Sequence, residues 1–147
     1  MVIKISKLGK NIEARFAHRY YQEIGLGIDF TARDLQRQLI EKGLPWEKAK
    51  AFDSSAVLGK FLPKEELGNL GMIPFSLRKN EVVVQSGDSH LMIFPFDIII
   101  EHVSKYVTLK IGDLIYTGTP AGVGPVAIGD RLEGFIGELS MFDIQVK

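Results

Sequence analysis

The ten residues Tyr116–Pro125 constrain this chain more than any other segment, because they exclude regular secondary structure. They contain three glycines, two prolines and two threonines. Glycine adopts backbone angles closed to other residues, and proline fixes φ and has no N–H to donate. The segment predicts either a loop that brings N–H groups and small hydroxyls to a ligand, or a tight structural connection. It does not match a phosphate-binding P-loop, because no Gly-Lys-Ser/Thr follows and no helix begins at Pro125.

A second polar segment begins at the end of a predicted buried strand, Gly25–Phe30, where Asp29 lies. Thr31 and the acidic Asp34 have the Thr-x-x-acid spacing of a capping box, which predicts a helix to about Lys42. The carboxylate of Asp29 therefore lies where sheet turns into helix and suits a cation. The alternative is that Asp29 merely assists the helix cap.

Arg33 and Gln36 are three residues apart and share a face in the first turns of that helix. Free N–H groups and the helix dipole favour anions there, so Arg33 suits an anionic substrate. A structural ion pair of Arg33 with Asp34 or Asp53 is the competing interpretation. Further along, Lys50 could neutralise a developing enolate, although most lysines are simply solvated.

The rest of the chain predicts an α+β fold rather than a regular βαβ alternation. Two or three short helices and seven or eight short strands are expected, with no internal repeat or linker. The middle, residues 51–71, is predicted to be rich in loops. The predicted strands cover Met1–Leu8, Gly25–Phe30, Met72–Leu77, Glu81–Gln85, Asp113–Thr117, Arg131–Ile136 and Leu139–Val146, and the predicted helices start at Asn11 (through Ile12, Phe16, Tyr20 and Ile24), Thr31 and Pro95.

The bulk composition excludes several classes of protein. Eighteen basic residues balance eighteen acidic ones, so no charged surface for nucleic acid is expected. The absence of cysteine excludes disulfides and thiol chemistry and fits a reducing compartment. The apolar runs are too short to span a bilayer, and no signal-peptide pattern is present. We expect one cytoplasmic domain, residues 1–147, that binds neither nucleic acid nor membrane.

Four segments in order resemble the C-terminal catalytic domain of the fumarylacetoacetate hydrolase family. This family includes acylpyruvate hydrolases, oxaloacetate decarboxylases and the isomerase/decarboxylase of homoprotocatechuate breakdown. The matching segments are Asp29–Gln36, Gly43–Asp53, Gln85–Phe94 and Thr117–Gly124. The resemblance implies a mixed β-sheet, roll- or barrel-like, with two or three short helices, and a homodimer.

The resemblance also implies an activity: metal-dependent cleavage of C–C bonds in short 2-oxo or 1,3-diketo acids of the acylpyruvate, fumarylpyruvate or oxaloacetate type. The metal that the resemblance implies is Mg²⁺ or Mn²⁺, which prefers hard oxygen ligands. By the same match Asp29 is a metal ligand and Lys50 lies by the reacting centre with Arg33. The substrate contacts it implies are Gln36, Gly118 and Thr119.

The family normally supplies two further metal ligands from a Glu-x-Glu, and here Met1–Ile5 resembles the residues immediately after it. The resemblance therefore predicts a domain shortened at its N-terminus and a lower metal affinity. Two alternatives to an active enzyme follow: a catalytically impaired domain that keeps the family fold, and a module that binds small anions without turnover.

Overall fold

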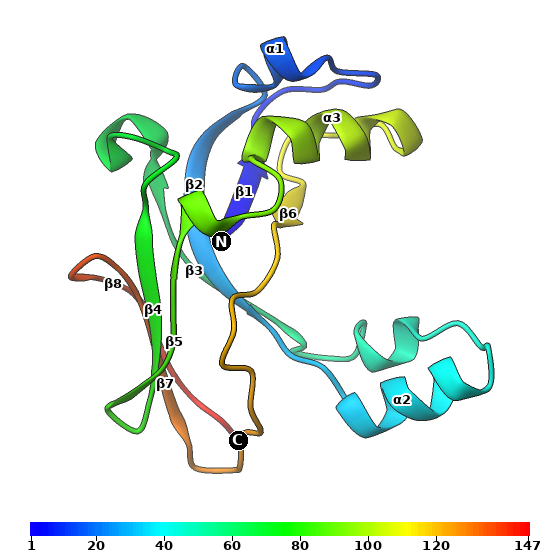
Figure 1. Cartoon of the computed structure of the whole chain (residues 1–147), viewed down its shortest axis with the longest axis vertical. Coiled ribbons are helices and arrows are strands. Elements are labelled where there is room, and N and C mark those ends of the chain that lie inside the picture. Colours follow the sequence, from blue (N-terminus) through cyan, green and yellow to red (C-terminus); the bar gives the residue numbers. More distant parts are fainter.

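The computed structural model describes residues 1–147 as two four-stranded antiparallel sheets and three α-helices (Figure 1). The first sheet has the order β3 (Ala56–Pro63), β2 (Tyr21–Asp29), β1 (Val2–Ile5), β6 (Leu114–Tyr116). The second has the order β5 (Val82–Asp88), β4 (Pro74–Lys79), β7 (Arg131–Ile136), β8 (Leu139–Gln145). The predicted α+β class is confirmed.

Both sheets are antiparallel at every strand pair, so neither is mixed, and they do not close into a barrel. For two of the six strand pairs the connection itself requires the antiparallel pairing. Parallel neighbours need a crossover of a dozen or more residues, whereas β4–β5 and β7–β8 are joined by tight turns that reverse the chain at once.

The hydrophobic core lies against the first sheet. Ile3 and Ile24, opposite each other on β1 and β2, are fully buried. Helices α1 (Ala14–Ala17) and α3 (Phe96–Tyr106) pack against each other at the end of the molecule where β1 and β6 lie (Figure 1). This end of the molecule is therefore well packed, and the loops that follow β2 and β6 lie at the opposite end.

The two sheets meet where β3 approaches β8. At Gly59 an added Cβ would lie 2.7 Å from the carbonyl oxygen of Met141, which leaves no room for a side chain. β2 also contacts β7. The sheets thus share one core on one side and diverge on the other, which opens a space between them.

Two predictions about the elements were wrong. The helix expected from Asn11 lasts one turn, because Tyr21 and Ile24 belong to β2 and pair with β1. A spacing of four residues suits either element locally, and strand pairing decides. The strand β3 lies in the middle region predicted to be loop; it is an edge strand with several exposed side chains, so it lacks strong apolar alternation.

Helix α2 (Arg33–Glu41) projects away from both sheets (Figure 1). Its start is tied to a 3₁₀ helix, Glu47–Ala49, by a hydrogen bond from Ala32 N–H to the Ala49 carbonyl, 3.0 Å. The predicted capping box does not form, and no side chain caps this helix. The hydroxyl of Thr31 contacts Lys50 instead. None of the helices has both the length and the hydropathy of a membrane-spanning segment.

Candidate active site

A cleft of about 700 Å³ lies between the two sheets. One wall is the end of β2 and the start of α2, and another is the β4–β5 hairpin. The loop after β6 forms the third side, where Gly118 and Thr119 line the cleft together with Pro120 and residues 122–126. Its floor is apolar and includes Leu26, Leu132 and Phe142. A cleft with an apolar floor and a few convergent polar groups is the usual form of a small-molecule site.

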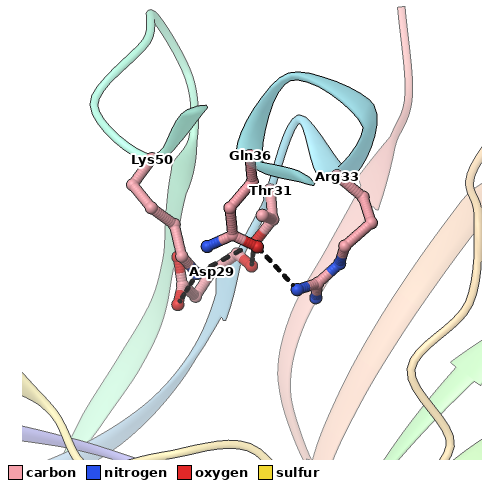
Figure 2. A network of polar contacts seen from close by, with 5 residues as sticks. All are labelled: Asp29, Thr31, Arg33, Gln36 and Lys50. Carbon is pink, nitrogen blue, oxygen red and sulfur yellow. Dashed lines mark hydrogen bonds and ion pairs between the residues drawn. The ribbon is translucent and has the colours of Figure 1, made fainter. Parts of the chain in front are cut away.

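The carboxylate of Asp29 is held by Lys50 at the end of β2 (Figure 2). Lys50 Nζ donates to Asp29 Oδ2 at 2.6 Å and to the hydroxyl of Thr31 at 2.8 Å. The side chain of Asp29 remains 40% exposed, so solvent or a ligand still reaches it. Thr31, expected to cap α2, instead fixes the ammonium group of Lys50.

Arg33 and Gln36 form a second pair in the first turns of α2 (Figure 2). Arg33 Nη1 donates to Gln36 Oε1 at 2.7 Å, and the side chain of Gln36 is buried. Arg33 makes no ion pair with Asp34 or Asp53, which removes the structural alternative considered for it. Its guanidinium group keeps donors free at the cleft wall.

The loop from Gly118 to Val126 makes no backbone–backbone hydrogen bonds. Thr117, just before it, ends the regular pairing by donating from its N–H to the Met1 carbonyl at 3.1 Å. Gly118 has a φ of 117°, a conformation that few residues other than glycine adopt. The N–H groups of Gly118 and Thr119 are thus free to serve as donors to an anion.

Tyr116, the first residue of the glycine-rich segment, was given no role of its own by the sequence analysis. Its hydroxyl donates to the Val57 carbonyl on β3 at 2.8 Å, and its ring passes over Gly27. Burial, and then the negative charge of Asp29, raises the pKa of Tyr116. Tyr116 therefore stays neutral beside Asp29 and ties β6 to β3 at the cleft.

The residues available for a metal ion are few. The structure contains no group of three or more His, Cys, Asp and Glu residues that could hold one. Mg²⁺ takes about six oxygens, commonly one or two carboxylates with the rest from water and substrate. Asp29 alone fits such a site as its single carboxylate, in competition with Lys50. The affinity must then depend on oxygens from the ligand.

Four of the six predicted site residues line the cleft, namely Asp29, Arg33, Gly118 and Thr119. Lys50 and Gln36 do not line it and reach it through hydrogen-bonded partners. No local pattern predicts the roles of Thr31 and Tyr116, because each depends on contacts with segments distant along the chain.

The chain is similar in sequence to known proteins over almost its whole length. Residues 1–146 match the family described as fumarylacetoacetate (FAA) hydrolase C-terminal. The mitochondrial oxaloacetate tautomerase of Mus musculus is 41% identical over 140 residues, and the mitochondrial oxaloacetate decarboxylase of Dictyostelium discoideum is 36% identical over 131 residues. These alignments cover 95% and 89% of this chain and 63% and 60% of the relatives.

Among solved structures, fumarylpyruvate hydrolase from Pseudomonas aeruginosa, in complex with Mn²⁺ and pyruvate, superposes with a TM-score of 0.92 at 35% identity. The match covers 99% of this chain and 62% of that protein. The chain thus spans less than two thirds of the length of these three relatives.

Proposed function

We propose, since this chain belongs to the fumarylacetoacetate hydrolase family, that its cleft binds short 2-oxo or 1,3-diketo acids and stabilises the enolates derived from them. The observation that carries the proposal is that Asp29, Arg33, Gly118 and Thr119, from two distant segments, line one cleft. The relatives named above act on oxaloacetate or fumarylpyruvate by their names, and one was crystallised with pyruvate and Mn²⁺. An acid with a 2-oxo group is common to all of them.

In this proposal the substrate carboxylate lies between Arg33 and the N–H groups of Gly118 and Thr119. Gln36 orients the guanidinium group through the 2.7 Å hydrogen bond, which lowers the entropy that Arg33 loses on binding. The apolar floor around Leu26 and Phe142 excludes water from the less polar part of the substrate.

In cleavage, the bond that breaks joins the carbon α to the oxo group to the next carbon, which leaves as CO₂ or, after water has added to it, as a carboxylic acid. The electron pair stays on the α carbon and delocalises onto the oxo oxygen as an enolate. Lys50, held on Asp29 and Thr31, contributes fixed positive charge beside this oxygen. A Mg²⁺ or Mn²⁺ ion held by Asp29 would add Lewis-acid polarisation of the oxo group. Tautomerisation would use the same stabilised enolate but would remove a proton from the α carbon instead of breaking a C–C bond, so the substrate decides which reaction occurs.

A second candidate function is the binding of small anions without turnover. It is favoured by the 2.6 Å ion pair, which already neutralises the single carboxylate available to a metal. This alternative retains Arg33 and the loop as the anion site and predicts no effect of metal. The homodimer, the single-domain organisation and the cytoplasmic location stay predictions.

Thermal unfolding tests the proposal, with Mg²⁺ or Mn²⁺ and oxalate added singly and together. A ligand specific for the folded state stabilises it by about 2.7 kcal/mol at a hundredfold excess over its dissociation constant. A shift that requires both metal and oxalate supports the enzyme, and a shift with oxalate alone supports the anion module. No shift in any combination contradicts both.

Turnover of oxaloacetate and of an acylpyruvate completes the test. Arg33→Ala and Asp29→Ala should abolish it, because they remove the carboxylate and metal contacts. Arg15→Ala, at an exposed position of α1, is the matched control for Arg33 and should leave turnover unchanged.

A further inference from the structure

We propose that the β4–β5 hairpin positions the Gly118–Val126 loop through two side chains, Gln85 and Lys79, and thereby sets the affinity of the cleft for a carboxylate ligand. The ligand part of this inference rests on the function proposed above. Gln85 and Lys79 are positioning residues in this proposal, because they act on the loop and not on the reacting atoms.

The loop depends on these two side chains for its hydrogen bonds. From Gly118 to Val126 its backbone forms none with other backbone groups. Gln85 Nε2 donates to the Pro120 carbonyl at 3.1 Å and lies 3.5 Å from that of Ala121, while Lys79 Nζ donates to the Pro125 carbonyl at 3.2 Å. A nine-residue segment is thus held near each of its ends from one hairpin.

Between these two points the loop touches the backbone of β5. A Cβ added to Gly122 would overlap the carbonyl oxygen of Val84, so only a glycine allows the approach. Gly122 also has a φ of 96°. The contact of Gly122 with Val84 includes no hydrogen bond. The loop therefore depends on Gln85 and Lys79 to stay against β5.

The turn that carries Lys79 is itself fixed by polar contacts. Asn80 accepts from the Arg131 N–H at 2.9 Å and donates to Asp130 at 2.8 Å. The other oxygen of Asp130 accepts from the Ala127 N–H at 2.9 Å, directly after the loop. Lys79 also lies 3.7 Å from Asp130. The hairpin and the end of the loop therefore form one unit.

The consequence for binding follows from preorganisation. The unpaired N–H groups of Gly118 and Thr119 bind an anion well only if they are already oriented, because ordering a loop on binding reduces affinity. A hydrogen bond of ordinary strength corresponds to about a 3- to 10-fold change in an equilibrium constant. We therefore expect the loss of either side-chain donor to weaken carboxylate binding by about that factor.

Loop mobility can be measured independently of binding. The chain has no cysteine, so Val123→Cys, at an exposed loop position, accepts a single nitroxide label. A more mobile loop narrows the lines of the label's electron paramagnetic resonance spectrum. We expect this narrowing in Gln85→Ala and Lys79→Met. We also expect it in Gln85→Glu, which keeps the size of the side chain but loses the N–H donor. Lys79→Arg keeps a donor and should preserve the parent spectrum, and Gln38→Ala on exposed α2 is the control.

Oxalate affinity is measured on the unlabelled proteins by calorimetry in the presence of Mn²⁺. We expect about a 3- to 10-fold weaker affinity in Gln85→Ala and Lys79→Met, with Lys79→Arg close to the parent. Unchanged spectra in both loss variants would overturn the proposal. Narrowed spectra with no oxalate binding by the parent support the positioning and instead refute the proposed function. A general loss of folding is recognised by a lowered unfolding midpoint. In that case the comparison of Lys79→Arg with Lys79→Met decides, because the proposal requires only the Met variant to free the loop.

Discussion

Replacing Gly122 by alanine would place a methyl group against the carbonyl oxygen of Val84, where the loop crosses β5. The φ of 96° at Gly122 is also unfavourable for alanine. Gly124 offers a matched control two residues further on. An added Cβ there meets nothing within 4 Å, and its φ is not positive.

The loop can respond to Gly122→Ala in two ways, which cost different amounts of free energy. If the loop stays in place, backbone strain costs about 1–2 kcal/mol and the overlap about 1–3 kcal/mol more. If the loop leaves β5, it loses the hydrogen bonds from Gln85 and Lys79, at about 0.5–1.5 kcal/mol each. Detachment is the cheaper response, so we expect Gly122→Ala to lower the free energy of unfolding by about 1–3 kcal/mol.

Urea unfolding followed by circular dichroism measures this loss, and a nitroxide at Val123→Cys reports whether the loop has detached. Gly124→Ala should change the free energy of unfolding by no more than about 0.5 kcal/mol and leave the spectrum unchanged. Equal losses in the two variants would refute the close approach at Gly122. A loss well above 3 kcal/mol with an ordered label would refute detachment as the cheaper response.

Three further perturbations test other parts of the structure. Ser104 is fully buried and accepts from the Ile12 N–H at 2.9 Å, so Ser104→Ala should lower the free energy of unfolding, measured in urea, by about 1–3 kcal/mol. Lys50→Met removes the cation that competes for Asp29, so it should tighten Mn²⁺ binding, measured by calorimetry, about 2- to 5-fold. The same variant should abolish turnover, because the positive charge beside the enolate is lost. Unchanged Mn²⁺ affinity would contradict Asp29 as the ligand. Hydrogen bonds from the N–H of residue 127 and the side chain of residue 80 lower the pKa of Asp130. Its stabilisation is therefore present above the ordinary aspartate value near 4 and is lost as the pH falls below it, and Asp130→Asn should flatten stability against pH over that range.

Much of the fold was predictable because it depends on local signals. The hairpin near Lys79, the helix after Pro95 and the last two strands each combine a clear period with a turn of glycine, proline or asparagine. Strand β3 and the short α1 were not predictable in this way. Their state is decided by partners far along the chain, since β3 pairs with β2 and the residues after α1 pair with β1.

For the site, the sequence by itself determined the chemical types: a carboxylate at Asp29, a guanidinium at Arg33, and a glycine-rich loop that cannot form regular structure. Only the tertiary structure decided how they are used. It paired Asp29 with Lys50, set Gln36 behind Arg33 and fastened the loop to Gln85 and Lys79. The physical reason is that residue type and spacing specify which groups are available, whereas hydrogen bonds between distant segments exist only once packing has brought those segments together.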